Sequence, residues 1–401
     1  MQKKNANILI AILFLLVTLP ACINSGADSR SNLQAPLDSL FGAMFQPDEP
    51  GAIILVAKGD SVVYCEGFGL ADLSASTPIN DSTLINICSI SKQFSAVALL
   101  KLQEEGLLSL DDSLPKYFPE LKAPFYNRIT LRHLLSHTSG IPDSRPRTRE
   151  EWNEYLKYHE SNFSTVHDFK RYSLTSESTE YLKGLRNLNF EPGTAYEYEN
   201  PTYQLVLPIV QKVTGMDFCE WMDSAIFRPA GMTHSVYLEP SADQPQLSHG
   251  YIRADGPNRY NYYRSPDGKW EECDYGEADF FPTKADGGLY TSARDFLAWE
   301  RALFAGKIIG EKSLKEAFTH YIGTDMAFTD YGLGFFLEKT PNGEKIYHTG
   351  DNGGYLTVEA YYPEKELFYL VFANRPDWDR DRTVEKIDSI LLCKGWLSAG
   401  K

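Results

Sequence analysis

The segment Ser89-Ile90-Ser91-Lys92-Gln93-Phe94 opens the stretch of sequence that decides the fold. Apolar residues recur at helical spacing behind it, and Gly106 can end the helix. We therefore predict a helix with a buried side that begins at Ser89. Because Ser89 and Lys92 are three positions apart, they share one face of this helix about one turn apart.

Ser89 and Lys92 together can support nucleophilic chemistry. A serine hydroxyl is a weak nucleophile until a neighbouring base takes its proton, and a lysine amine can do so where desolvation keeps part of it neutral. The start of a helix adds backbone N–H groups that favour negative charge. Many surface helices match this spacing by chance, so the assignment needs further elements.

A second element is Tyr196-Glu197-Tyr198-Glu199-Asn200, which follows Glu191-Pro192-Gly193-Thr194. In an extended segment Tyr198 and Asn200, two positions apart, point the same way. The phenol can share a proton with Lys92, and the amide can position a substrate amide or carbonyl group. A packed loop after a Pro-Gly turn is the structural alternative.

The third element is His348-Thr349-Gly350, which follows a strand-like segment at 344–347 and precedes Asp351. Glycine permits close approach of the backbone to a substrate, and a strand edge can supply an N–H group to an oxyanion hole. A histidine beside a glycine is more often structural than catalytic.

Strand-like and helical patterns alternate along the chain in a definite order. Residues 51–57 and 61–69 are predicted to form a hairpin, and 110–255 a mainly helical region. The crowded aromatic stretch 256–282 suggests a long surface loop or an extra hairpin. Further strands are predicted near 333–338, 344–348, 354–362 and 366–373, and helices at 205–214, 217–227, 292–304 and 382–393. These patterns predict a discontinuous α/β domain (36–90 and 260–401) that carries a helical domain (91–259).

Composition excludes several classes of protein. The chain has 401 residues, of which 43% are hydrophobic and 23% charged, so it is globular rather than disordered. Its formal net charge is -15, which would repel nucleic-acid phosphates, and no nucleic-acid partner is expected. The six cysteines show no zinc-binding spacing, and no metal site is predicted.

The N-terminus is typical of a targeting segment. Lys3 and Lys4 precede an apolar run at 8–19 that is too short to span a bilayer. We predict a signal peptide at 1–21 and a flexible tether at 22–35, with the first helix starting near Leu37. The sequence before Cys22 resembles a bacterial lipoprotein cleavage box, which makes Cys22 the lipid-bearing residue of an anchored envelope or periplasmic protein. The alternative is ordinary secretory cleavage nearby, and both predict export.

Taken together, the three motifs resemble the serine β-lactamase-like family, in its class C β-lactamase, D-alanyl-D-alanine carboxypeptidase and esterase branch. The order and the gaps from Ser89 to Tyr198 and from Tyr198 to His348 fit this branch. Similar stretches occur at 131–142 and 285–295, so the resemblance spans residues 36–395. It implies an α+β fold, an antiparallel sheet flanked by helices with an inserted all-α domain.

The resemblance also implies roles for individual residues. Ser89 would be the nucleophile, Lys92 and Tyr198 the proton-transfer pair, and the N–H groups of Ser89 and Asp351 the oxyanion hole. The residues implied to bind, position or polarise the substrate are Asn200, His348, Thr349 and Gly350. The reaction would be acyl transfer to Ser89 followed by hydrolysis, with no metal or organic cofactor.

Two neighbouring residues could be mistaken for catalytic ones. His137 belongs to the stretch 131–142, which in such proteins looks like a turn that supports the fold. Cys88 adjoins the nucleophile but lies outside the Ser-x-x-Lys register, and we expect it to be a small buried residue.

Departures from the family pattern bear on the substrate. Class C β-lactamases usually have lysine where this chain has His348, and Asp351 would repel the carboxylate of a β-lactam or a terminal D-alanine. The strand 335–338 offers no arginine to bind such a carboxylate. We therefore expect an exported serine hydrolase for an ester or amide, with weak penicillin turnover. The alternatives are a D-alanyl-D-alanine carboxypeptidase, or penicillin-binding protein, and a catalytically silent peptide-binding protein.

Overall fold

The computed structural model describes most of the chain, but neither its first residues nor several internal segments. The described residues are 27–143, 176–237, 246–253, 269–272, 284–324, 326, 329–352 and 354–397. The predicted signal peptide at 1–21, Cys22 and most of the stretch 256–282 lie outside them. Among the helices within these ranges, none combines the length and the apolar character that crossing a bilayer requires.

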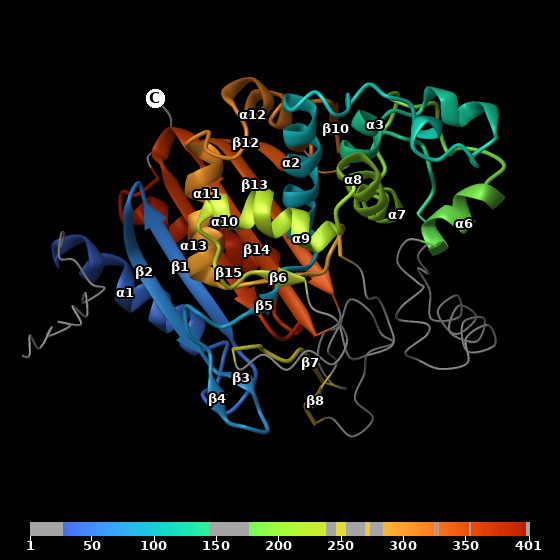
Figure 1. The fold of residues 1–401 in the computed structure, drawn as a ribbon. Helices are drawn as coiled ribbons and strands as arrows, with labels where there is room; N and C mark the ends of the chain where they lie inside the picture. Colours follow the sequence, from blue (N-terminus) through green and yellow to red (C-terminus); the bar gives the residue numbers. More distant parts are fainter. Residues whose placement is uncertain are drawn as a thin grey trace, which may run out of the picture.

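The centre of the fold is an eight-stranded antiparallel sheet. In Figure 1 its N-terminal strands are blue and its C-terminal strands orange to red. Its strand order is β10-β11-β12-β13-β14-β15-β1-β2, so the two ends of the chain meet where β1 pairs with β15. The strands are β1 (Ala52–Lys58), β2 (Ser61–Phe68), β10 (Ile322–Gly323), β11 (Thr329–Tyr331), β12 (Phe336–Thr340), β13 (Gly343–Asn352), β14 (Tyr355–Tyr362) and β15 (Leu367–Ala373). The predicted hairpin and the C-terminal strands are confirmed.

Both faces of the sheet are covered, which explains the unbroken apolar runs in its central strands. In β1, Ile53 and Leu55 belong to one hydrophobic cluster, whereas Ile54 and Val56 belong to another on the opposite face. Helices α1 (Ala27–Gly42) and α13 (Arg380–Cys393) cover the second face, and α2 (Ser91–Glu104) and α11 (Ala293–Phe304) pack on the first. The predicted antiparallel sheet flanked by helices is confirmed.

Helix α1 differs from the prediction at the N-terminus. It begins at Ala27 rather than near Leu37, so residues 27–35 of the predicted tether are helical. Leu33, Leu37 and Phe41, spaced four apart, are completely buried against the sheet. The small polar residues at 27–35 have low helix propensity and therefore predicted a flexible segment. The helix is stabilised instead by packing of its one apolar stripe against the sheet.

Within the described residues between α2 and β9 (Leu289–Thr291), most of the regular elements are short helices. Helix α8 ends at Gly215 in the left-handed conformation, and 217–227 is helical with a π-helical second half. The helices are α3 (Leu131–Leu135), α6 (Ser176–Gly184), α7 (Pro201–Gln204), α8 (Val206–Thr214), α9 (Phe218–Met222) and α10 (Arg228–Ala230), with α12 (Glu311–Ala317) further along the chain.

Three small sheets complete the fold. The strands are β3 (Leu70–Asp72) with β4 (Thr77–Pro78), β5 (Ile85–Asn86) with β9 (Leu289–Thr291) and β6 (Val236–Tyr237), and β7 (Tyr251–Ile252) with β8 (Glu271–Glu272). The β7–β8 pair is antiparallel and includes part of the stretch for which a loop or an extra hairpin was predicted. Strand β5 leads directly into the turn that carries Ser89.

Two buried carboxyl groups should make the stability of the fold depend on pH. Burial raises the pKa of Glu359, on β14, to about 8 and that of Glu300, on α11, to about 7. Both line one small pocket, where Gln93 donates a hydrogen bond to Glu359. Between pH 4.5 and 8 the unfolded chain loses protons that the folded protein keeps, so stability should fall as pH rises through this window.

The variant Glu359→Gln should remove much of this dependence, because the amide keeps an acceptor for Gln93 and cannot ionise. We expect its thermal unfolding midpoint to exceed that of the wild type at pH 8, by several degrees, and to match it near pH 4.5. The exposed Glu364→Gln is the control. Equal slopes of midpoint against pH for Glu359→Gln and the wild type would refute the assignment.

Candidate functional site

Ser89 lies on a tight turn rather than on the regular helix. A 3-10 turn, η1 (Cys88–Ile90), carries it, and the α-helix α2 begins two residues later at Ser91. Cys88 has a positive φ of 52°, and its N–H donates to Asn86 Oδ1 at 2.7 Å. A non-glycine residue in this conformation is strained and is held by its surroundings. The turn thus places Ser89 just before the N-terminus of α2.

Lys92 is completely buried and touches Ser89. Its Nζ lies 3.1 Å from Ser89 Oγ, 2.8 Å from Asn200 Oδ1 and 2.8 Å from the carbonyl oxygen of Asp286. The amide and carbonyl oxygens can only accept hydrogen bonds. Nζ therefore donates to these two oxygens, which hold it in place within hydrogen-bond reach of Ser89 Oγ.

The second predicted motif meets the same lysine. Asn200 accepts from Lys92 through Oδ1, which leaves its NH2 group for other partners. The Tyr198 ring centroid lies 5.0 Å from Lys92 Nζ, and Tyr198 and Ser89 line one cleft. The predicted convergence of Tyr198 and Asn200 on Lys92 is therefore present, although more than 100 residues separate the two motifs.

The third motif lies on the part of β13 that β12 does not cover. Strand β12 pairs with β13 only as far as Tyr347, whereas β14 continues beside β13 to Asn352. Gly350 packs against the Ser89 turn: a Cβ there would lie 2.3 Å from Thr357 Oγ1 and 2.4 Å from the carbonyl oxygen of Ile87. Only glycine allows this approach. The strand edge predicted to supply the Asp351 N–H thus lies beside Ser89.

His348 is a neutral residue in this arrangement. Burial, with the nearby charge of Lys92, lowers the pKa of His348 to about 3. Its Nδ1 lies 2.7 Å from the carbonyl oxygen of Thr349, which can only accept, so Nδ1 carries the proton. Nε2 then accepts from the Tyr331 hydroxyl at 2.9 Å. His348 therefore does not reproduce the charge of the lysine that class C β-lactamases usually have here.

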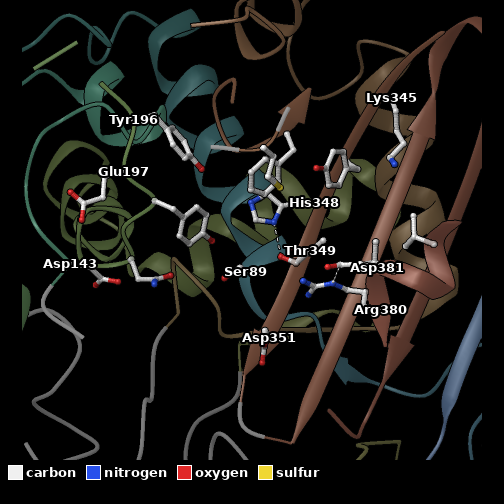
Figure 2. Close-up of a pocket in the computed structure, with 17 residues that line it drawn as sticks. Ser89, Asp143, Tyr196, Glu197, Lys345, His348, Thr349, Asp351, Arg380 and Asp381 are labelled. Atoms are coloured by element: carbon white, nitrogen blue, oxygen red, sulfur yellow. Dashed lines mark hydrogen bonds and ion pairs between the residues drawn. The ribbon is translucent and has the colours of Figure 1, made fainter. Parts of the chain in front are cut away.

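These residues line a cleft of about 800 Å³. Figure 2 shows Ser89 at its centre, between Asp143 and Glu197 on one wall and His348, Thr349 and Arg380 on the other. The residues predicted for the site that line it are Ser89, Tyr198, Asn200, His348, Thr349 and Asp351. Lys92 and Gly350 support them from behind through the contacts described above.

Arg380 is a cleft residue that sequence reasoning missed. It is the first residue of α13, and its Nη1 donates to the carbonyl oxygen of Gly350 at 3.3 Å. Its Nε lies 3.5 Å from Asp381, and Figure 2 shows its guanidinium group pointing toward Thr349. An arginine was expected only on the strand before the third motif. Arg380 instead reaches the cleft from the start of α13, 30 residues after Gly350.

The two residues considered as misleading candidates are buried. Cys88 has no exposed surface, and burial raises the pKa of its thiol well above the usual range, so its thiolate is not available as a nucleophile. His137 is equally buried, and its ring lies 4.3 Å from the ring of Tyr198. Within the described ranges, no group of three or more His, Cys, Asp or Glu side chains is arranged to hold a metal ion.

Comparison with known proteins identifies relatives across most of the chain. The model of the family described as Beta-lactamase matches residues 37–392. Penicillin-binding protein 4* of Bacillus subtilis (strain 168) is 27% identical over 349 residues, which cover 85% of this chain and 72% of that protein. A D-aminopeptidase of Gluconobacter oxydans (strain 621H) is 25% identical over 325 residues, which cover 81% of this chain but 56% of the aminopeptidase.

Solved structures agree with this fold. The octameric penicillin-binding protein homologue from Pyrococcus abyssi has a TM-score of 0.72 and 25% identity over 92% of this chain and 79% of its own. A class C beta-lactamase has a TM-score of 0.72 at 20% identity, over 94% of this chain and all of its own. A D-amino acid amidase from Ochrobactrum anthropi SV3 has a TM-score of 0.69 at 23% identity, over 91% and 98%.

Proposed function

Because this chain belongs to the beta-lactamase family and is a serine hydrolase of that family, we propose that it cleaves an ester or amide through an acyl-enzyme on Ser89. The observation that carries the proposal is the 3.1 Å contact between Ser89 Oγ and Nζ of the fully buried Lys92. A nucleophile within hydrogen-bond reach of a base that is itself oriented by other groups is the arrangement that activates serine.

The proposed reaction runs in two halves. Lys92 accepts the proton of Ser89 as Oγ attacks the substrate carbonyl, and the N–H groups of Ser89 and Asp351 stabilise the oxyanion. Tyr198, beside Lys92, returns a proton to the leaving group as the acyl-enzyme forms. Water then attacks the acyl-enzyme, the same pair accepts its proton and passes it to Ser89 Oγ, and Ser89 is released as the free hydroxyl. The Asn200 NH2 group positions the acyl part of the substrate.

The charges of the cleft bear on the substrate class. Asp143 and Glu197 on one wall favour a cationic group, such as the free amine of an amino acid amide. Relatives named D-aminopeptidase and D-amino acid amidase support an amide of this kind. We therefore infer that amides and esters with a positively charged acyl part are the preferred substrates.

A D-alanyl-D-alanine carboxypeptidase is the second candidate, and Arg380 favours it. Its guanidinium group can bind a terminal carboxylate and opposes the repulsion expected from Asp351. The similarity to penicillin-binding protein 4* supports the same candidate. In both cases we propose that the enzyme is exported and carries a lipid on Cys22, on the strength of the apolar run and cleavage box in residues 1–22.

The test compares wild type with Ser89→Ala. We expect a fluorophosphonate probe to label the wild type at Ser89 and to leave the variant unlabelled, because only an activated serine reacts. Hydrolysis of a nitrophenyl ester should likewise require Ser89. A wild-type protein that neither reacts with the probe nor cleaves the ester would leave the catalytically silent binding protein as the correct description.

The substrate panel then separates the candidates. Faster cleavage of a D-amino acid amide than of its N-acetylated form would support a cationic acyl part. Release of D-alanine from a peptide ending in two D-alanines would favour the carboxypeptidase. We expect benzylpenicillin to be hydrolysed with an efficiency below about 10⁴ M⁻¹s⁻¹, since Asp351 stands beside the oxyanion strand. A higher value would contradict the expected weak turnover.

A further inference from the structure

His137 holds the backbone on both sides of Tyr198. Its carbonyl oxygen accepts from the N–H of Glu197 at 3.0 Å, and its ring Nδ1 accepts from the N–H of Glu199 at 3.2 Å. One residue thus supplies the hydrogen bonds that a neighbouring strand would otherwise make to an extended segment. Between these two bonds the side chain of Tyr198 leaves the backbone and reaches the cleft.

The ring of His137 also packs directly on the ring of Tyr198. The two centroids are 4.3 Å apart with the planes inclined by 38°, and the rings of Tyr331 and Tyr203 lie 4.7 Å and 5.1 Å from the imidazole. Tyr203 in turn donates its hydroxyl to the carbonyl oxygen of Leu135, at the end of α3. The imidazole is therefore enclosed by aromatic rings.

The protonation state of His137 follows from these contacts. Because Nδ1 accepts a backbone N–H, the proton of the neutral ring is on Nε2, which has no hydrogen-bond partner among the described residues. Burial, with the nearby charge of Lys92, keeps the pKa of His137 well below its usual range. A charged ring would carry a proton on Nδ1 and lose the bond to Glu199.

The backbone conformation of His137 contributes to the same hydrogen bonds. Its φ is 56°, in the left-handed region that non-glycine residues seldom adopt, directly after α3 ends. This conformation turns its carbonyl group toward Glu197 while the ring reaches Glu199. The turn 136–140 therefore has a defined task at the site, beyond joining two elements.

We propose that His137 is a positioning residue, which holds residues 197–199 so that Tyr198 stays beside Lys92 in the cleft that Ser89 lines. The proposal rests on the proposed function, in which Tyr198 transfers protons, and adds a residue that acts through it. His137 touches neither the cleft nor the substrate, so it should govern the rate and the pH dependence of the reaction rather than substrate affinity.

Two variants distinguish the effect of the hydrogen-bond acceptor on His137 from the effect of its side-chain volume. In His137→Asn, Oδ1 replaces Nδ1 as the acceptor for Glu199, and asparagine tolerates a positive φ. In His137→Leu the acceptor is absent. The control is His133→Leu, because His133 lies within α3, away from Tyr198, and its Nδ1 likewise accepts a backbone N–H, that of Thr130 at 3.2 Å. Thermal unfolding of all three reports any loss of stability separately.

The first readout is the rate of fluorophosphonate labelling and of ester hydrolysis against pH. We expect kcat to fall at least about 30-fold in His137→Leu with KM nearly unchanged, and its acid limb to shift, because the proton-transfer pair is misplaced. His137→Asn should recover most of this loss, and His133→Leu should keep the wild-type profile. Equal kcat and pH profile in His137→Leu and wild type would overturn the proposal.

The second readout needs no catalysis and therefore distinguishes the two proposals. Hydrogen exchange of the peptide that contains Glu197 to Glu199 should accelerate in His137→Leu and stay slow in His137→Asn. If the wild type proves unreactive, the proposed function fails, and this exchange still decides whether His137 holds the segment. Unchanged exchange in His137→Leu would overturn the positioning role by itself.

Discussion

Replacement of Lys92 by methionine should abolish Ser89-dependent hydrolysis while the protein stays folded. Lys92 is the amine in contact with Ser89 Oγ, and it also fixes Asn200 through Oδ1. Removal of the base from a serine hydrolase that depends on it costs on the order of 10⁴-fold to 10⁶-fold in kcat. We expect a loss of at least about 10⁴-fold in ester hydrolysis and in the rate of fluorophosphonate labelling.

The stability of Lys92→Met distinguishes loss of chemistry from loss of structure. The Lys92 side chain is fully buried, and methionine of similar length keeps its packing but leaves the oxygens of Asn200 and Asp286 without this donor, at a cost of about 1–3 kcal/mol. We therefore expect a folded protein whose unfolding midpoint lies a few degrees below that of the wild type. Lys101→Met, on the same helix and partly exposed, is the control and should keep full activity. Normal labelling of Lys92→Met would show that another group activates Ser89.

The variant Gly350→Ala should impair the site through geometry alone. Its Cβ would lie 2.3 Å from Thr357 Oγ1, 2.4 Å from the carbonyl oxygen of Ile87 and 2.8 Å from Cys88 Cβ. These atoms belong to the backbone or to short side chains, so β13 must move away from the Ser89 turn. A misplacement of about 1 Å costs about 10²-fold in rate. We expect kcat to fall by at least this factor.

The control for Gly350→Ala is Gly184→Ala, since a Cβ on Gly184 meets nothing within 4 Å. The double variant Gly350→Ala with Thr357→Ala should stay impaired, because the carbonyl oxygen of Ile87 is part of the backbone and remains in the way. Recovery of wild-type kcat in this double variant would place the strain at the Thr357 side chain and refute the displacement of the turn.

The local features of the site could be predicted because they depend on spacing along the chain. The helical period behind Ser89 predicted α2, and the two-residue and three-residue intervals of the motifs predicted which side chains share a face. The helix was predicted to begin at Ser89, whereas α2 begins at Ser91. Residues 88–90 form a 3-10 turn instead, in which the N–H of Cys88 donates to Asn86 Oδ1. The periodicity of apolar residues does not predict such hydrogen bonds between a side chain and the backbone.

The sequence alone determined the order of the three motifs, the apolar strands that form a sheet buried on both faces, and the pairing of Ser89 with Lys92. Only the tertiary structure decided which groups surround them: the neutrality of His348, the entry of Arg380 into the cleft, the start of α1 at Ala27 and the hold of His137 on Tyr198. Spacing within an element follows from backbone geometry, whereas burial, charge and contact across the fold depend on residues that lie far apart in the chain.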